Sequence, residues 1–309
     1  MLINQMRIVS RFTSVILTSL CLFLQTSALT SEMMRVAVVT GANKGIGKAI
    51  ASNLATSGIF THVILGCRDN ALAIPAVKEI SDAKNACNVS SFQLTIGDNE
   101  SHASFCKAIE EKFGKVDVLV NNAGMAFKSA DPTSFEDQCK PTLDVNFRGT
   151  VDFTEHILPL VRKGSDARIV NVASMAGKLS QLRSKELQNA FSSPVLARND
   201  LYELVNKYEV SVKRASFANA GEHAERGWGN SNYGFSKLAL IAMTKVWARE
   251  EAKNGISVNC CCPGYCDTDM TSHRGSRSAT DGAKNAVIPA TMENPPKGEY
   301  FSDYKVATW

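Results

Sequence analysis

The stretch T-G-A-N-K-G-I-G (Thr40–Gly47) lies between a short apolar run and a helical pattern. The run before it, Val36–Thr40, is rich in valine and predicts a strand. The residues Ile46, Ile50 and Leu54 recur at helical spacing and predict a helix after it. Glycine suits a backbone that takes positive φ angles or closely approaches a ligand. The stretch therefore predicts a tight strand-to-helix turn.

A turn of this kind predicts a dinucleotide-binding site. The first N–H groups of a helix are free to bind an anion, and glycines let a pyrophosphate approach them. The alternative is a structural turn without a ligand, which is disfavoured by its position at the start of a strand–helix–strand series. The residues that would form this part of the site are Gly41, Asn43, Lys44, Gly45, Ile46 and Gly47.

Strand and helix patterns alternate along most of the remaining chain. This order indicates parallel strands joined by crossover helices, that is, an α/β doubly wound parallel sheet, or Rossmann fold. Further strands are predicted at Val63–Cys67, Phe92–Ile96, Val116–Asn121, Arg168–Ser174 and Ile256–Cys262, and further helices at Ser101–Phe113 and Phe135–Arg162.

One region interrupts this alternation. Residues 178–230 have no strand pattern, although Ser184–Phe191 and Asp200–Tyr208 have helical patterns. We interpret the region as a helical insertion within a single domain that spans residues 33–309.

Composition excludes several functional classes. The 309 residues are 44% hydrophobic, which is enough for a substantial core. The 34 basic and 30 acidic residues give a net charge of +4 without a long block of like charge, so nucleic-acid binding is not expected. The nine cysteines do not suggest a disulfide framework in a chain of this length, and their spacing indicates no metal site.

The first 32 residues resemble a signal peptide or another targeting leader. Two arginines and no acid precede the apolar run Phe12–Leu24, which is shorter than the roughly 20 residues needed to cross a bilayer. Small residues at 26–28 offer a cleavage site, so entry into the secretory pathway or an organelle is expected. Two alternatives stay open: an uncleaved membrane anchor, and a cytoplasmic protein translated from Met33 or Met34.

The end of the second predicted strand indicates which dinucleotide binds. An acidic side chain there would bind a ribose 2′-hydroxyl and repel a 2′-phosphate, but this chain has Gly66-Cys67-Arg68. Arg68, assisted by Lys44, could hold a phosphate through charge-assisted hydrogen bonds. NADPH or NADP+ is therefore expected. The alternative is that Arg68 is a solvated loop residue and Asp69 selects the cofactor.

Tyr233 and Lys237 lie one helical turn apart in the stretch Y-G-F-S-K. The ordinary pKa of tyrosine is about 10, so its phenol exchanges protons near neutral pH only if a positive charge stabilises the phenolate. Lys237 is placed to supply that charge. By itself the pair is a weak indication, because this spacing often arises by chance on helices.

Several further motifs follow in order, and together they resemble the short-chain dehydrogenase/reductases, specifically the monomeric NADPH-dependent carbonyl reductases. The resemblance runs from about Arg35 to Trp309 and includes the glycine turn and the Y-x-x-x-K pair. The other matching motifs are N-N-A-G at 121–124, D-V-N-F-R-G-T around Asn146, Ser174 at the end of the fifth strand, and P-G-x-x-x-T-x-M at 263–270.

The resemblance assigns roles to individual residues. It implies the catalytic residues Asn146, Ser174, Tyr233 and Lys237. The residues that it adds to the cofactor site are Asn122, Ala123, Gly124, Tyr233, Lys237, Pro263, Gly264 and Thr268.

The implied reaction is reduction of an aldehyde, ketone or quinone to an alcohol. The nicotinamide would give a hydride while Tyr233 donates a proton to the carbonyl oxygen, which Ser174 holds. Lys237 would lower the pKa of Tyr233 and bind the nicotinamide ribose, and Asn146 would hold a water that links the lysine to solvent. Two alternatives are a dedicated reductase or alcohol dehydrogenase for one cyclic substrate and, from another class, a non-catalytic NADPH-binding regulator.

Ser174 and Tyr233 lie 59 positions apart, far more than in most of the family. The resemblance implies that the insertion between them covers the helix face by which relatives dimerise, so a monomer is expected.

Two other details bear on what binds. The aromatic residues Trp228 and Tyr265 would wall a substrate pocket together with Ser174 and Tyr233, which suits flat or apolar carbonyl compounds. The alternative is that both are ordinary packing aromatics. Thr95 stands where the family commonly has an aspartate that binds adenine, so cofactor affinity is expected to differ.

Overall fold

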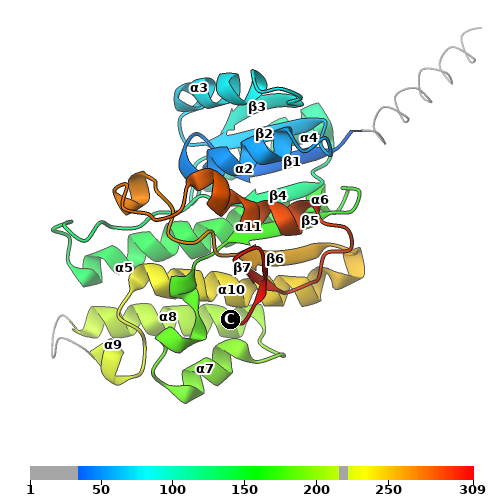
Figure 1. Ribbon diagram of the computed structural model, residues 1–309. Coiled ribbons are helices and arrows are strands. Elements are labelled where there is room, and N and C mark those ends of the chain that lie inside the picture. Colours follow the sequence, from blue (N-terminus) through cyan, green and yellow to red (C-terminus); the bar gives the residue numbers. More distant parts are fainter. Residues whose placement is uncertain (1–33, 216–221) are drawn as a thin grey trace, which may run out of the picture. The chain divides into compact units, whose positions relative to one another are not determined.

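A mostly parallel sheet forms the centre of the fold (Figure 1). The computed structural model describes residues 34–215 and 222–309, so the predicted leader lies outside the described residues. The eight strands have the order β3-β2-β1-β4-β5-β6-β7-β8, and only the β7–β8 pair is antiparallel. The strands are β1 (Val36–Thr40), β2 (His62–Cys67), β3 (Asn88–Gln93), β4 (Val118–Asn121), β5 (Arg168–Val172), β6 (Ser257–Cys261), β7 (Tyr300–Ser302) and β8 (Lys305–Ala307).

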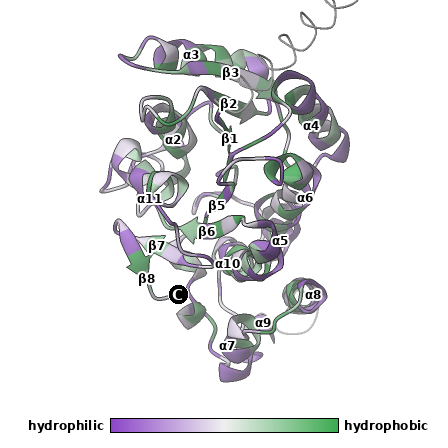
Figure 2. Cartoon of the chain, turned by 90° about the vertical axis from the view of Figure 1, so that its right-hand side faces the viewer, coloured by the Kyte–Doolittle hydropathy of each residue, from purple (hydrophilic) through white to green (hydrophobic). Residues whose placement is uncertain are grey.

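Helices cover both faces of this sheet, which confirms the predicted Rossmann fold. Figure 2 shows α2 and α11 on one face and α4, α5, α6 and α10 on the other. The order of the strands reverses between β1 and β4, and ligands of such sheets bind at the carboxyl ends near this switch point. The helices are α2 (Gly45–Ala55), α3 (Asn70–Ser81), α4 (Asn99–Phe113), α5 (Phe135–Leu143), α6 (Thr150–Val161), α10 (Asn232–Glu250) and α11 (Ala279–Thr291).

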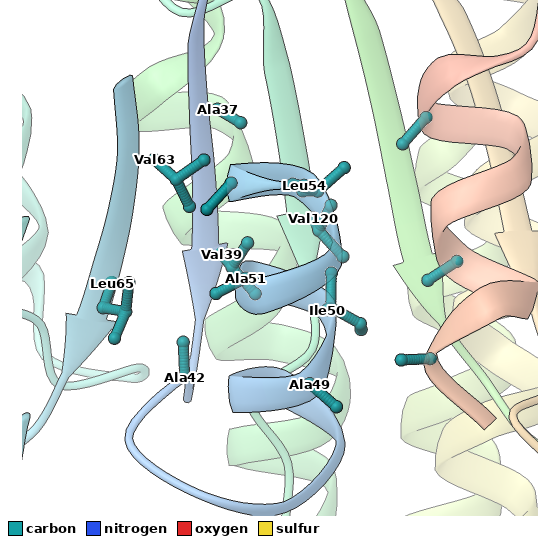
Figure 3. Packing of buried hydrophobic residues seen from close by; sticks show 14 of the residues in the cluster. Ala37, Val39, Ala42, Ala49, Ile50, Ala51, Leu54, Val63, Leu65 and Val120 are labelled. Atoms are coloured by element: carbon teal, nitrogen blue, oxygen red, sulfur yellow. The ribbon is translucent and has the colours of Figure 1, made fainter. Parts of the chain in front are cut away.

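The central strands are buried along their whole length, as expected where helices cover both faces. Figure 3 shows how the apolar face of α2 packs on the sheet: Ile50 and Leu54 lie against a layer that includes Val39 and Val120. All four side chains are fully buried. This packing fixes α2 directly after β1 and so fixes the turn between them.

The predicted strand Phe92–Ile96 is wrong in its position, because β3 begins at Asn88 and ends at Gln93. β3 is the edge strand of the sheet and is only partly buried, so it lacks the apolar run of the inner strands. The apolar signal came partly from Leu94, which is buried in the following loop. A Cβ on Gly66 would lie only 2.8 Å from the Leu94 Cδ2. The sequence patterns also did not predict α3, β7 or β8.

The predicted helix Phe135–Arg162 contains a π-helical segment, η1 (Asp144–Gly149), between α5 and α6. The backbone is crowded here, since a Cβ on Gly149 would lie 2.7 Å from both the Asp144 O and the Gly97 N. Insertions of this kind into α-helices are frequent at functional sites. The segment carries Asn146, whose side chain is buried.

The described part of the segment between β5 and α10 consists of short helices joined by loops and contains no strand. It packs on α10: the Tyr208 ring stacks on Phe235 with 3.7 Å between ring centroids, and the Tyr208 hydroxyl donates to the Asn232 Oδ1 at 2.8 Å. None of the helices in the described part of the chain is long and apolar enough to span a membrane. The elements of the segment are η2 (Met175–Gly177), η3 (Leu179–Gln181), α7 (Lys185–Ser192), α8 (Arg198–Ala215) and α9 (Glu222–Glu225).

Candidate active site

The glycine turn after β1 has the geometry that its sequence predicts. Gly41 and Gly45 have φ angles of +63° and +57°, in the left-handed region that favours glycine. Gly47 has no room for a side chain, because a Cβ there would lie 2.4 Å from the Gly41 O. Asn43, Lys44 and Ile46 complete the turn into α2.

The N-terminus of α2 is open to an anion. No side chain of the described residues caps it, and its first turn contains no acid. By contrast, Asp98 caps α4 and Ser231 caps α10. The first N–H groups of α2 therefore remain available, and with the helix dipole they favour a phosphate group. These residues fit the pyrophosphate of a dinucleotide.

The N-N-A-G motif after β4 braces this turn. The backbone N–H groups of Asn122 and Ala123 donate to the Thr40 Oγ1 at 3.0 and 2.9 Å. The Asn122 Nδ2 donates to the Thr40 O at 2.8 Å. A Cβ on Gly41 would lie 2.9 Å from the Ala123 Cα, so the two motifs are in direct contact.

Arg68 lies directly after β2, and its side chain is exposed. The neighbouring Asp69 caps α3, where its Oδ1 accepts from the Ala71 N–H at 2.8 Å. This capping role favours Arg68 over Asp69 as the residue that selects the cofactor. Lys44 forms an exposed ion pair with Asp269, with 2.6 Å between Nζ and Oδ2, so a phosphate at Lys44 would compete with that carboxylate.

The structure brings Ser174 to Tyr233 and Lys237 despite their separation in sequence. Ser174 follows β5, its hydroxyl caps η2, and its side chain is hydrogen-bonded to Tyr233 in α10. Lys237 lies one turn further along α10, with its Nζ 5.8 Å from the centroid of the Tyr233 ring. The Lys237 Nζ also donates to the Val172 O at 2.8 Å. The carboxyl end of β5 thus contacts the first turns of α10.

Asn146 joins this group through the backbone after β4. Its Oδ1 accepts from the Met125 N–H at 2.8 Å, and its Nδ2 donates to the Met125 O at 2.8 Å. Its Nδ2 also donates to the Ser236 Oγ in α10 at 3.1 Å. Gly124 lies beside both polar groups, since a Cβ there would be 3.1 Å from the Asn146 Oδ1 and 3.4 Å from the Lys237 Nζ. The residues that the resemblance named as catalytic are therefore neighbours.

Burial is the largest influence on the pKa values of Tyr233 and Lys237. It raises the pKa of the Tyr233 phenol to about 12, although the hydrogen bond to Ser174 acts in the opposite direction. It also lowers the pKa of the Lys237 ammonium to about 8. The expected lowering of the Tyr233 pKa by Lys237 is thus not what the structure has. The ammonium group donates to the Val172 O, and desolvation by burial is the largest influence on the pKa of Tyr233.

The segment after β6 closes the site from the other side. Gly264 has a φ angle of +83°, and Thr268 lies against the glycine turn, with its Cγ2 3.5 Å from where a Cβ on Gly45 would be. The Cys262 Sγ, just before Pro263, accepts from the N–H groups of Met175 and Gly264 at 3.1 and 3.3 Å. The predicted strand Ile256–Cys262 did not indicate these hydrogen bonds, because contacts between distant backbones leave no local signal.

The two aromatic residues predicted for the substrate pocket have different surroundings. Trp228 is only 4% exposed and packs edge-on against Phe191, Tyr208 and Phe235. These are packing contacts, and a role of Trp228 in the substrate pocket stays a prediction. Tyr265 is 51% exposed and can meet a ligand.

Two exposed methionines lie near the motifs: sequence reasoning included Met270 in the P-G-x-x-x-T-x-M motif but did not single out Met175. Met175 follows Ser174 and is 59% exposed, and Met270 follows Thr268 by two positions and is 44% exposed. Their positions beside Ser174 and in the T-x-M motif were the available signals. Thr95 is half-buried, with its N–H donating to the Ser101 Oγ at 2.9 Å, and its effect on cofactor affinity stays a prediction.

A second polar cluster, His102, Asp152 and His156, was not indicated by the sequence. The His102 Nε2 accepts from the Gly97 N–H at 3.1 Å, and its Nδ1 lies 2.6 Å from the Asp152 Oδ2. Both ring nitrogens of His102 are therefore engaged within the protein. A metal bound through Nδ1 would require the ring proton on Nε2, but Nε2 already accepts a hydrogen bond from the Gly97 N–H. The cluster holds the loop after β3.

Comparisons with known proteins show what the chain is similar to. The family model for short chain dehydrogenase matches residues 35–185 and 218–279, and the residues between these segments lie in the insertion. Carbonyl reductase [NADPH] 1 of Rattus norvegicus is 36% identical over 284 residues, which cover 89% of this chain and 98% of the relative. The human protein of the same name is 35% identical over 289 residues, which cover 90% and 100%.

Two solved structures are similar over nearly the same range. Salutaridine reductase from Papaver somniferum has a TM-score of 0.76 and 28% identity, covering 87% of this chain and 99% of that chain. Menthone neomenthol reductase from Mentha piperita has a TM-score of 0.70 and 27% identity, covering 87% and 98%.

We expect Arg68→Ala to weaken NADPH binding roughly 10- to 100-fold, because a hydrogen bond to a charged group contributes about 1.5–3 kcal/mol. The dissociation constant of NADH should change little, since NADH lacks the 2′-phosphate. Titration calorimetry with both cofactors measures this. Arg183→Ala is the matched control, because Arg183 is also an exposed arginine but lies in the insertion, away from the end of β2. Equal losses for NADPH and NADH in Arg68→Ala would contradict the assignment.

Proposed function

The chain belongs to the short-chain dehydrogenase family, and we propose that it reduces the carbonyl group of aldehydes, ketones or quinones to an alcohol. It is an NADPH-dependent oxidoreductase, as its identity of about 36% to NADPH-dependent carbonyl reductases over nine tenths of the chain indicates. The observation that carries the proposal is the convergence of Ser174, Tyr233 and Lys237 at the end of β5. The N-N-A-G motif contacts both Lys237 and the glycine turn that leads to the open N-terminus of α2.

In this proposal Ser174 and Tyr233 have different roles at the carbonyl oxygen. NADPH, when bound, supplies the hydride that the carbonyl carbon accepts. Ser174 holds the oxygen by a hydrogen bond, and Tyr233 donates the proton. A raised tyrosine pKa suits this direction, because the phenol keeps its proton throughout the neutral range. Asn146 holds the backbone after β4 against α10 and so keeps Gly124 beside Lys237.

The exposed side chains near the site support an apolar substrate. Met175, Tyr265 and Met270 present apolar surface on the segments that carry Ser174 and Thr268. A flat aromatic or alicyclic carbonyl compound would bury this surface on binding.

A second candidate function is a dedicated reductase for one cyclic substrate. It is favoured by the similar structures, whose names specify salutaridine and menthone as what those enzymes act on. A panel of cyclic ketones, quinones and aromatic aldehydes with NADPH oxidation as the readout distinguishes the two. Comparable turnover across the panel supports a general carbonyl reductase, whereas one compound ahead by orders of magnitude supports the dedicated enzyme.

Tyr233→Phe should lower kcat for carbonyl reduction by roughly 10²- to 10⁴-fold, because it removes the proton donor alone. NADPH binding, measured by calorimetry, should change little. Tyr202→Phe, which removes a phenol from α8 beside Phe147, should keep the turnover of the unmodified protein. A Tyr233→Phe protein with full turnover would exclude Tyr233 as the proton donor.

The dependence of kcat/KM on pH should follow the protonation state of the Lys237 ammonium. Its pKa of about 8 means that the ammonium is charged below that pH and neutral above it. We therefore expect kcat/KM for carbonyl reduction to be level below about pH 8 and to fall above it, while Tyr233 stays protonated. Lys237→Arg keeps the charge and should move the fall to higher pH. A profile that stays level well above pH 8 would count against a requirement for the charged Lys237 ammonium in carbonyl reduction.

We also propose that the protein is a monomer. Through α8 the insertion covers η1, α6 and α10: Arg198 pairs with Glu155 and Glu250, both at 2.6 Å, and Arg148 in η1 pairs with Glu209 at 2.7 Å. Light scattering coupled to gel filtration should give the mass of one chain, 33.5 kDa for the full sequence. A mass of two or four chains that persists on dilution would contradict the proposal.

A further inference from the structure

The turn η2, which follows Ser174, is held by side chains from three other parts of the chain. They come from the insertion, the end of β6 and the last residue of the sequence. Each contacts a different backbone group of the turn, so the turn is fixed along its whole length. The three bonds are Met175 N–H to Cys262 Sγ (3.1 Å), Gln181 Nε2 to Ala176 O (2.7 Å) and Trp309 Nε1 to Gly177 O (2.8 Å).

Gln181 also contacts the helix that carries Tyr233. Its Nε2 donates to the Gly234 O at 3.0 Å, in addition to the Ala176 O. Ala176 lies two residues after Ser174, and Gly234 follows Tyr233 directly. An amide NH2 group has two donors, and both are used here. One side chain of the insertion thus joins the two segments that carry the serine and the tyrosine.

The packing around Gln181 leaves no alternative arrangement of its amide. A Cβ on Gly234 would lie 2.8 Å from the Ala176 O and 2.9 Å from the Gln181 Oε1, so the two segments are already in close contact. A rotated amide would place Oε1 against two carbonyl oxygens, which only accept hydrogen bonds. In the present orientation Oε1 is buried and has no partner among the described residues.

That unpartnered oxygen has an energetic consequence. A buried acceptor without a hydrogen bond costs about 1–3 kcal/mol. An apolar side chain of the same length would avoid this cost, but it would leave the Ala176 O and the Gly234 O without the donors of Gln181. What distinguishes a glutamine at this position is its pair of donors to the segments that carry Ser174 and Tyr233.

We propose that Gln181 is a positioning residue that sets the separation between the Ser174 hydroxyl and the Tyr233 phenol. The proposal rests on the proposed function, because the two hydroxyl groups must bind the same carbonyl oxygen. Gln181 contacts neither the glycine turn nor Arg68, so its loss should affect the reaction and not the binding of NADPH. The insertion then forms part of the catalytic site.

The test compares two glutamines of the insertion. Gln181→Met keeps the length of the side chain and removes both donors. Gln188→Met is the matched control, because the Gln188 Nε2 also donates to a backbone carbonyl, that of Leu182 at 2.7 Å, and Gln188 is similarly half-buried. Gln188 contacts neither catalytic segment. The assays are kcat and KM with an aromatic aldehyde, the dissociation constant of NADPH, and Tm.

We expect kcat of Gln181→Met to fall by roughly 10- to 100-fold, since small misplacements of catalytic groups have effects of this size. Its NADPH affinity and Tm should stay within the range of Gln188→Met, which should keep the kcat of the unmodified protein. Unchanged kcat in Gln181→Met would overturn the proposal. Equal losses of kcat and Tm in both variants would overturn it as well, because they would indicate a merely structural role.

Hydrogen exchange of the cofactor-free protein separates this proposal from the proposed function. Amides of 174–177 and of the first turn of α10 should exchange faster in Gln181→Met than in Gln188→Met, whether or not any carbonyl compound is reduced. If the unmodified protein reduces no carbonyl compound, the proposed function fails while exchange still reports whether Gln181 holds the two segments. Identical exchange in the two variants would show that it does not.

Discussion

The Thr40 hydroxyl, which accepts from the N–H groups of Asn122 and Ala123, is the contact on which the site depends. It ties the end of β1 to the end of β4, the two strands between which the order of the sheet reverses. The glycine turn then lies directly against the N-N-A-G motif, whose Asn122 amide donates to the Thr40 O. The position of a ligand at this edge of the sheet therefore depends on this contact between β1 and β4.

Beyond the junction, the fold has to bury polar groups without leaving them unpaired. Asn146 and Lys237 are 1% and 4% exposed, yet each is hydrogen-bonded to a backbone group. The π-helical segment displaces Asn146 from the regular ladder of α5 and α6, so that both ends of its amide reach Met125. Lys237 lacks a carboxylate partner among the described residues, and its lowered pKa reflects that environment.

The sequence predicted the parts of this site that are set by local chemistry. Glycines with positive φ, such as Gly41, and uninterrupted apolar strands are visible in short windows, and their order along the chain indicates the sheet. Contacts between distant segments are not visible in this way. The thiol of Cys262 and the aromatic surroundings of Trp228 depend on which backbones meet. The same holds for the edge strand β3, whose position depends on its neighbour β2 more than on its own pattern.

At the beginning of α10, a local sequence motif is held in place by contacts with distant segments. A catalytic hydroxyl must stay available to the substrate, so its own hydrogen bonds cannot be what fixes it. Tyr233 is instead held through the residues on either side: the Asn232 amide donates to the Phe135 O and accepts from Tyr208, and the Gly234 O accepts from Gln181. Two of these three contacts come from the insertion. A segment that interrupts the regular alternation of strands and helices therefore holds the first turn of α10, while the Tyr233 phenol contacts the Ser174 side chain.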